Sequence, residues 1–484
     1  MNDTYITIKH YLNGPPRPSW DLKFHLTWAM LKSALESSHT TTIEQAQKNF
    51  SLFGLTPADE VINEFKIKNE YRYEAQAHID KILKPYEHVL DTEWKDLKDD
   101  GIISEWVQNP NDGWENREIR KTILYLHGGG YCTCSKESHR NVTCSLTKKT
   151  NARVLGKFKI NLKRIQPLIN YLVKISFIAI NYRLAPQNQF PAALQDALAA
   201  YLYLLNPPKD AGFEPLNPKN IVIAGDSAGG ALSLALGLAI RDSDLPPCAG
   251  IIGLSPWVDL TQSTPSVLNN ECIDYVPNTV AGATFAESQV YSEYKEKAAA
   301  LTAKIKNQNL GPKIWHDSFD RPNGRFQLYA PNEGLAIPYV SPMLAESLCN
   351  LPPLLLTIGD DERLRDETIY FAHRSSEPTK YKGPSYNAGK FEKSPFQTPT
   401  NTTLEIYEDM PHVFQFMEHA CTEKSYERMA EFVDRVTNSL NESLPPSSYN
   451  YISAKGEISP SLKEYHKEVL KWEKIGILPS NAQN

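Results

Sequence analysis

From Arg120 onward, short apolar runs alternate with helical segments, and this alternation restricts the chain to a small set of folds. The runs rich in β-branched and aliphatic residues are Thr122–Leu126, Phe177–Ile180, Asn220–Ala224, Gly250–Leu254, Pro353–Ile358 and Thr403–Tyr407. Helical periodicity fills Pro191–Leu205 and Gly229–Arg241 between them. Such alternation is typical of a mostly parallel sheet with helices on both faces. We therefore predict an α/β fold whose functional residues follow the carboxyl ends of the strands.

The rest of the chain lacks this strand pattern. Helical periodicity appears around residues 24–31 and 71–90, and polar helical sequence covers 283–305. A short helix is expected around 462–472, after a Pro- and Ser-rich linker. The predicted units are a helical N-terminal segment that contributes to a lid (1–115), a catalytic domain (116–440), a lid insertion within it (about 262–340) and a C-terminal tail (441–484).

The composition excludes several classes of protein. The chain has 484 residues, of which 41% are hydrophobic and 22% charged, with a formal net charge of −6. A disordered chain has fewer apolar residues, and a nucleic-acid-binding protein needs clustered Lys and Arg. The most apolar stretch, Ile165–Tyr182, contains Gln166, Asn170 and Lys174, so it does not predict a membrane span. We expect no nucleic-acid partner, and the sequence does not indicate an oligomeric state.

The cysteines and the N-terminus bear on location and metal content. Seven cysteines form no Cys-x-x-Cys pair, which favours reduced thiols over disulfides. The close pair Cys132-Thr-Cys134 lacks the further ligands that complete a zinc site, so neither a metal nor a cofactor is expected. Residues 1–10 are polar and unlike a secretory signal, which favours an intracellular, cytoplasmic location.

One motif places a serine at a sharp turn. Gly225-Asp-Ser-Ala-Gly229 follows the strand Asn220–Ala224 and opens a helix, which is the context of a Gly-x-Ser-x-Gly nucleophile elbow. The glycines are required because the chain reverses too sharply for neighbouring side chains. Ser227 is the predicted nucleophile. The alternative is a glycine-rich turn without catalytic function, or a phosphate-binding loop.

A second motif lies about one hundred residues upstream. His127-Gly-Gly-Gly130 directly follows the strand Thr122–Leu126. Consecutive glycines leave backbone N–H groups free to bind a developing oxyanion, and the N–H of the residue after the nucleophile completes such a site. The candidate donors are Gly128, Gly129, Gly130 and Ala228, and the sequence does not choose among the glycines. His127 is expected to brace this loop rather than transfer protons.

A catalytic serine needs a base and an orienting acid, and in the fold that carries this nucleophile elbow the chain order is serine, acid, histidine. His412 follows the strand Thr403–Tyr407 and is the predicted base. Its alternative is a histidine in a surface loop. The acidic residues after the strand Pro353–Ile358 are Asp360, Asp361, Glu362, Asp366 and Glu367, and any of them could serve on position alone.

Five motifs in this order resemble those of the hormone-sensitive-lipase branch of the α/β-hydrolases. They are His127-Gly-Gly-Gly-Tyr131, Asn181-Tyr-Arg-Leu-Ala-Pro186, Gly225-Asp-Ser-Ala-Gly-Gly230, Ser255-Pro-Trp-Val-Asp259 and Met410-Pro-His-Val-Phe414. The resemblance covers roughly 120–436 and implies an α/β-hydrolase fold with a helical lid. Members carry Asp-x-Leu-x-Asp after the penultimate strand, with the first acid in the triad. That position is Glu362 here, so the resemblance implies Glu362 in preference to Asp361.

Two insertions depart from the family pattern. Residues 156–174 are rich in Lys and Arg, and a basic loop near a lid could contact an anionic membrane surface. A solvated loop or translated non-coding sequence are the favoured alternatives. Residues 375–399 separate the acid from the histidine and predict a long surface loop.

Together these motifs predict a serine hydrolase that cleaves carboxylic esters through Ser227, His412 and Glu362. The expected substrate is a neutral, apolar ester, because the chain is slightly acidic and Trp20, Phe24, Trp28 and Tyr131 are expected near the mouth. The resemblance implies short- to medium-chain, sterol or aryl esters. The alternatives are an amidase or acyltransferase with the same triad, and a ligand-binding protein without turnover. Plant gibberellin receptors are similar to this branch but lack the histidine, which this chain retains.

Overall fold

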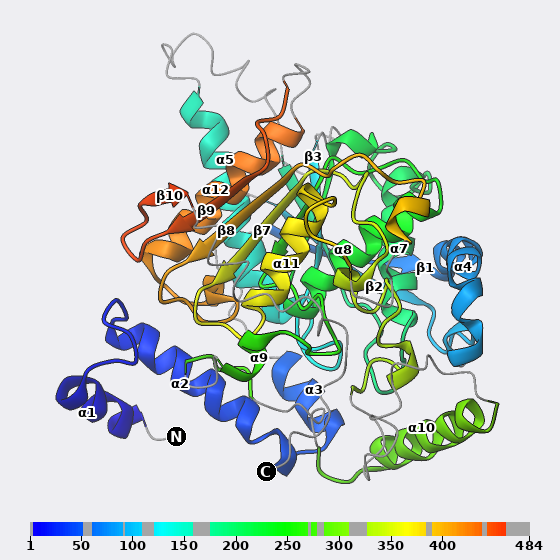
Figure 1. Ribbon diagram of the computed structural model, residues 1–484, viewed down its shortest axis with the longest axis horizontal. Coiled ribbons are helices and arrows are strands. Elements are labelled where there is room, and N and C mark those ends of the chain that lie inside the picture. The colour runs from blue at the N-terminus through cyan, green and yellow to red at the C-terminus, as the bar shows by residue number, and fades with distance from the viewer. Residues whose placement is uncertain are drawn as a thin grey trace.

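A ten-stranded sheet forms the centre of the molecule. The computed structural model describes residues 3–51, 61–90, 92–108, 121–157, 175–269, 273–277, 285–308, 327–383, 390–437 and 443–460. The strand order is β1-β2-β4-β3-β5-β6-β7-β8-β9-β10 (Figure 1). The strands are β1 (Val61–Lys68), β2 (Gly101–Gln108), β3 (Lys121–Leu126), β4 (Ile175–Ile180), β5 (Ile221–Asp226), β6 (Gly250–Leu254), β7 (Leu354–Gly359), β8 (Thr402–Tyr407), β9 (Ser448–Ile452) and β10 (Ile458–Pro460).

The six predicted strands are the central, parallel part of this sheet. Each pairs in parallel with its neighbours from β4 through β3, β5, β6 and β7 to β8. Where burial is described, these strands are covered on both faces, which explains why their sequences are nearly continuous apolar runs. The predicted α/β fold with a mostly parallel sheet is confirmed.

The N-terminal segment 1–115 differs from the prediction, because it is not only helical. Its strands β1 and β2 pair with each other in antiparallel orientation, and β2 continues the sheet beside β4. In β1, Phe65 and Ile67 alternate with charged residues, as expected for an edge strand with one covered face. The predicted boundary near residue 115 therefore cuts through the sheet.

The C-terminal tail, 441–484, also contributes to the sheet. The strand β9 pairs in parallel with β8, and β10 pairs in antiparallel orientation with β9. The sequence of β9, Ser-Tyr-Asn-Tyr-Ile, lacks an apolar run, which is why no strand is predicted there. The short helix expected around 462–472 lies outside the described residues.

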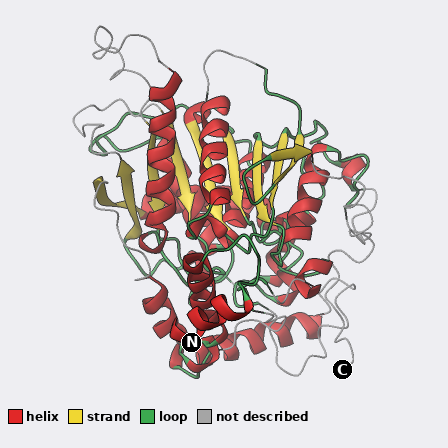
Figure 2. Cartoon of the chain, turned by 90° about the vertical axis from the view of Figure 1, so that its left-hand side faces the viewer, coloured by secondary structure: helices red, strands yellow, loops and turns green. Residues whose placement is uncertain are grey.

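Helices cover both faces of the sheet (Figure 2). Along β3, Ile123 and Tyr125 pack on one face against α5 and α12, while Leu124 and Leu126 join α4, α7, α8 and α11 on the other. This two-residue alternation is the strand period. The helices are α1 (Asp3–Asn13), α2 (Leu22–Glu36), α3 (Ile43–Ser51), α4 (Asn69–Leu83), α5 (Arg140–Lys157), α7 (Ala192–Leu205), α8 (Ser227–Asp242), α9 (Pro265–Asn269), α10 (Gln289–Gln308), α11 (Arg365–Ser376) and α12 (Ala420–Val436).

Helices α2, α3, α9 and α10 lie along one end of the sheet (Figure 1). The side chain of Trp20, just before α2, donates a hydrogen bond to the carbonyl oxygen of Asp409 in the loop after β8, at 2.8 Å. The N-terminal helices therefore cover the carboxyl end of the sheet, where a site is expected. None of the described helices has the length and apolar character needed to cross a membrane.

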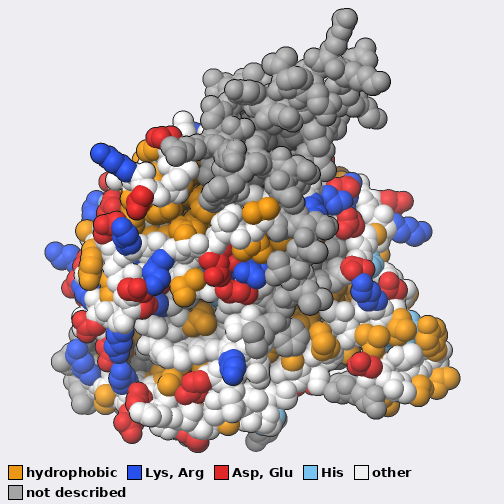
Figure 3. Space-filling view, turned by 180° about the vertical axis from the view of Figure 1, so that it is seen from behind, with side chains coloured by type: hydrophobic (Ala, Val, Ile, Leu, Met, Phe, Trp, Pro, Cys, Tyr) orange, Lys and Arg blue, Asp and Glu red, His pale blue; other side chains and the backbone are white. Residues whose placement is uncertain are grey.

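Helix α1 leaves an apolar face uncovered. Tyr5, Ile8, Tyr11 and Leu12 are all exposed, and apolar side chains gather over the N-terminal helices at the lower right of Figure 3. The helix contacts α2 through the ring of His10, whose Nδ1 lies 3.2 Å from Nδ1 of His25. Helix α1 therefore contributes no side chain to the hydrophobic core clusters of the described residues.

Candidate active site

The strand β5 ends at Asp226, and the helix α8 begins directly at Ser227. Ser227 has a positive φ of 51°, a conformation that a non-glycine residue seldom adopts. A Cβ atom on Gly225 would collide with the carbonyl oxygen of Gly229, and one on Gly229 would collide with that of Leu126. The sharp strand-to-helix turn therefore requires both glycines, and it presents the half-buried Ser227 at the carboxyl end of the sheet.

The glycine loop follows β3, the neighbour of β5. Gly129 and Gly130 have positive φ angles of 102° and 61°. The amide of Gly128 donates to Oδ1 of Asp226 at 3.1 Å, so this predicted donor faces the interior. In the described part of the chain, no group accepts a hydrogen bond from the amides of Gly129 or Gly130.

Asp226 ties the glycine loop to the elbow. Its buried carboxylate accepts a hydrogen bond from the hydroxyl of Tyr125 at 2.7 Å and lies 3.1 Å from Nε2 of His139. Burial favours protonation, but His139 and Tyr125 outweigh it and hold the pKa of Asp226 below its ordinary value. Asp226 thus has a structural role, and no sequence pattern singles out its partner His139.

His127 supports the glycine loop. Its ring stacks on Tyr182 with centroids 4.3 Å apart, and the Tyr182 hydroxyl donates to the carbonyl oxygen of His127 at 2.7 Å. Burial, together with the nearby His139, lowers the pKa of His127 to about 3. A neutral, enclosed imidazole of this kind braces the loop, as the sequence favours.

The predicted acid and base lie together in the loops after β7 and β8. Oε1 of Glu362 is 4.0 Å from Nδ1 of His412, and both side chains are buried. Burial lowers the pKa of His412, but the adjacent Glu362 more than compensates, so the pKa lies above its ordinary value. Burial also raises the pKa of Glu362, against the opposing effect of His412. Each group thus favours the charged form of the other.

Ser255, after β6, holds this pair in place. Its hydroxyl donates to Oε2 of Glu362 at 2.6 Å and accepts from the amide of Val413 at 3.0 Å. The amide of Gly359 donates to the same carboxylate oxygen at 2.9 Å. One hydroxyl therefore connects the acid to the backbone beside His412. In the sequence Ser255 is only the first residue of a family motif, with no sign of this contact.

The competing acidic residues have other partners. Asp361 accepts two hydrogen bonds from the guanidinium group of Arg17, at 2.6 and 2.5 Å. The remaining three also bond elsewhere, namely Asp360 with Tyr451, Asp366 with the amide of Ser266, and Glu367 with the amide of Asp259. Among the five candidates, Glu362 therefore lies closest to the predicted base.

Sheet register brings these loops to one end. The end of β5 aligns with the end of β6 at the pair Asp226 and Leu254, and the end of β7 aligns with that of β8 at Gly359 and Tyr407. The carbonyl oxygen of Ser227 accepts a hydrogen bond from the amide of Trp257 at 3.0 Å. The elbow, the acid and the histidine thus all follow the carboxyl ends of parallel strands, as predicted.

One carboxylate cluster has the spacing of a metal site. Oxygen atoms of Glu64, Glu105 and Glu137 lie within 4.8 Å of one another. The ammonium group of the buried Lys136 donates to all three, at 2.6, 2.9 and 2.5 Å. A side-chain cation already neutralises this cluster, so its role is structural.

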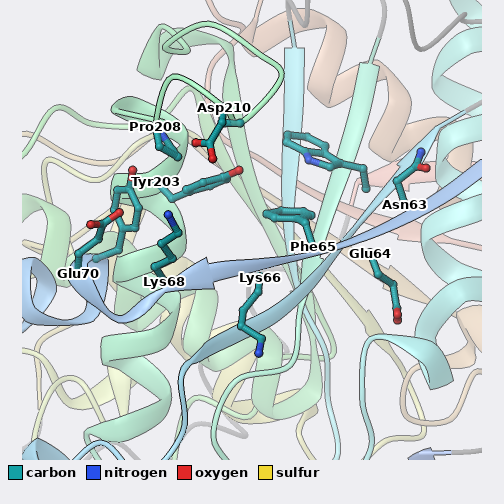
Figure 4. Close-up of a pocket in the computed structure, with 12 residues that line it drawn as sticks. Asn63, Glu64, Phe65, Lys66, Lys68, Glu70, Tyr203, Pro208 and Asp210 are labelled. Atoms are coloured by element: carbon teal, nitrogen blue, oxygen red, sulfur yellow. The ribbon is translucent and has the colours of Figure 1, made fainter.

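A surface pocket lies beside the edge strand β1, away from these loops (Figure 4). Phe65, Trp106 and Tyr203 form its aromatic wall, and Lys66 and Lys68 lie at its rim. Phe65 stacks on Tyr203 with centroids 5.5 Å apart. None of the predicted catalytic residues lines this pocket, so it is separate from the candidate active site.

Known proteins share this architecture. Residues 168–315 match a family model described as the alpha/beta hydrolase fold. An acetyl-hydrolase of Streptomyces hygroscopicus is 26% identical over 65% of this chain and 72% of its own length. The esterase LipU of Mycobacterium tuberculosis is 31% identical over 32% of this chain, and the match spans only 39% of that protein.

Solved structures extend the similarity to most of the chain. The crystal structure of an esterase from the bacterial hormone-sensitive lipase family superposes with a TM-score of 0.53 and 21% identity, covering 87% of this chain and 99% of the other. At that identity the likeness shows the fold. The chain therefore has the α/β-hydrolase fold, and the two relatives are named an acetyl-hydrolase and an esterase.

Proposed function

We propose that this protein is a serine hydrolase that cleaves carboxylic esters with Ser227, His412 and Glu362. The observation that carries the proposal is the buried pair of Glu362 and His412, held at the same end of the sheet as the strained serine. Their separation of 4.0 Å exceeds a hydrogen bond, and catalytic hydrogen bonds without substrate are commonly long and tighten when it binds.

The steps follow from these roles. His412 takes the proton of Ser227 while the serine oxygen attacks the ester carbonyl, and Glu362 stabilises the resulting imidazolium. His412 then gives this proton to the leaving alcohol, which leaves an acyl group on Ser227. A water molecule, deprotonated by His412, releases the acid and restores the serine.

The oxyanion of each tetrahedral intermediate needs backbone donors. Of the predicted donors, Gly128 is engaged with Asp226, so we assign this role to Gly129, Gly130 and Ala228. Ala228 is the second residue of α8, and the first amides of a helix have no partner within the helix. Two of these amides belong to the glycine loop after β3, and the third belongs to the first turn of α8.

An apolar ester suits the surroundings of the serine. Trp20 and Phe24, expected near the mouth, instead pack in a buried cluster with Met410 and Phe414. Tyr131, directly after the glycine loop, stacks on Tyr329 with centroids 3.7 Å apart and lies 6.3 Å from Trp257. This aromatic group adjoins both the oxyanion donors and Ser227, which favours an apolar acyl or alcohol group.

Hydrolysis of p-nitrophenyl esters of increasing acyl length tests the proposal. We expect turnover of the acetate and butyrate, with kcat/KM falling for long chains, and release of free acid rather than transfer to another alcohol. A ligand-binding protein would bind an ester without releasing p-nitrophenol. An amidase would prefer the matching anilide, and an acyltransferase would need an added acceptor. The intracellular location and the absence of a nucleic-acid partner remain predictions from the sequence.

The pH dependence of turnover follows from the state of His412. The base must be neutral to accept the serine proton, and its pKa is raised above the ordinary value of about 6.5. We therefore expect kcat/KM to fall as the pH drops through a midpoint above 6.5. Glu362→Gln should move this midpoint to lower pH, because Glu362 raises the pKa of His412. A midpoint well below 6.5 in the wild type would argue against His412 as the base.

A further inference from the structure

Asp274 joins the two loops that carry the proposed acid and base. Its carboxylate is buried and belongs to the short segment 273–277 within the predicted lid. Oδ2 accepts a hydrogen bond from the amide of Arg363, the residue after Glu362, at 2.7 Å. Oδ1 accepts one from the amide of His412 at 3.3 Å. A single carboxylate therefore binds the backbone of both loops. In the acid loop the contact is one residue after Glu362, and in the other loop it is at His412 itself.

Helix α2 holds the segment that carries Asp274. The indole N–H of Trp28 donates to the carbonyl oxygen of Ile273 at 2.7 Å, and the ammonium group of Lys32 donates to that of Asp274 at 3.4 Å. The next residue, Tyr275, meets the ring of His412 edge-on, with centroids 5.9 Å apart. The lid segment is thus fixed between the N-terminal helix and the proposed base.

We propose that Asp274 is a positioning residue, which aligns the loop of Glu362 with the loop of His412 and places a second negative charge beside the imidazole. This inference rests on the proposed function. It assigns to a segment of the predicted lid a role in aligning the acid with the base.

The charges around His412 support an electrostatic effect as well as a geometric one. The carboxylates that act on the imidazole come from the acid loop, the lid and the elbow, namely Glu362, Asp274 and Asp226, and all three raise its pKa. Tyr275 packs against the ring from the lid. Two cations donate hydrogen bonds to backbone carbonyl oxygens of the same segment, Lys32 to Asp274 and the guanidinium group of Arg363 to Val276. Removing the charge of Asp274 should therefore lower the pKa of His412.

Two variants separate alignment from charge. Asp274→Asn keeps the size but loses the charge and offers an N–H to the backbone amides, so kcat should fall about 10- to 100-fold through misalignment. The midpoint of the acid limb should also move to lower pH. Asp274→Glu keeps the charge but displaces it by one methylene, so kcat should fall while the midpoint stays at the wild-type pH. Asp361→Asn, on the same loop but facing Arg17, is the matched control and should leave both values unchanged.

The outcomes distinguish this inference from the proposed function. If wild type hydrolyses p-nitrophenyl butyrate and Ser227→Ala does not, the proposed function stands. If a folded Asp274→Asn then keeps the wild-type kcat and the wild-type midpoint of the acid limb, the role of Asp274 is overturned while the proposed function still stands. If Asp274→Asn does not fold, as judged by circular dichroism and thermal melting, Asp274→Glu decides. Reduced kcat with an unmoved midpoint supports the positioning role, and unchanged kcat overturns it.

Discussion

Replacing Ser227 with alanine is expected to lower kcat for a p-nitrophenyl ester by about 10⁶-fold, because no acyl-enzyme can form without the serine oxygen. KM should change little, since the aromatic group around Tyr131 and the oxyanion donors are retained. The fold should also be unaffected, because alanine removes only one oxygen atom. The initial rate of p-nitrophenol release at saturating ester measures this effect.

Ser243 offers a matched control on the same helix. It caps the carboxyl end of α8, and in the described part of the structure its buried hydroxyl has no hydrogen-bond partner. Ser243→Ala should therefore retain wild-type kcat. Equal residual activity in the two alanine variants would contradict Ser227 as the nucleophile.

Glu362→Gln is expected to lower kcat by about 10⁴-fold, the effect typical when the orienting carboxylate of a triad becomes an amide. The glutamine cannot stabilise the imidazolium that forms as the serine proton leaves. The substitution also removes the negative charge to which the hydroxyl of Ser255 and the amide of Gly359 donate hydrogen bonds. Steady-state kinetics at a pH above the acid limb of the pH profile measure this loss without interference from protonation of His412.

Asp361→Asn is the paired comparison, because the two acids are adjacent in sequence but face different partners. Asp361 binds the guanidinium group of Arg17, and breaking this partly exposed ion pair should cost at most about 1 kcal/mol of stability. Its kcat should stay close to that of the wild type. A large loss in Asp361→Asn with near-normal turnover in Glu362→Gln would move the role of the acid to Asp361.

The sequence predicts the central sheet well because its strands are buried on both faces. In Ile221–Asp226 every residue before the aspartate is apolar, and in Leu354–Gly359 only Thr357 is polar, which is a strong local signal. The outer strands have no such signal. In β1 Phe65 and Ile67 alternate with charged residues over only five positions, and β9 has no apolar run. These local patterns are too short to identify the strands, which are revealed by pairing with a neighbouring strand.

In the candidate site, too, some residues can be predicted from the sequence and others cannot. Ser227 and the glycine loop can be predicted from the sequence because a sharp turn requires particular residue types at these positions. The contacts that support them join residues far apart in the chain. Ser255 and Glu362 are 107 positions apart, and Asp274 and His412 are 138. Such contacts depend on packing, so one sequence cannot indicate them.

Covalent labelling with a fluorophosphonate tests most directly whether Ser227 is an activated nucleophile. We expect the folded wild type to gain one phosphonyl group, which peptide mass spectrometry assigns to Ser227, and to lose esterase activity in proportion. Labelling of His412→Ala should be much slower, and Ser227→Ala should not react. Stoichiometric labelling of Ser227→Ala, or no labelling of a folded wild type, would contradict a serine-hydrolase mechanism at this site.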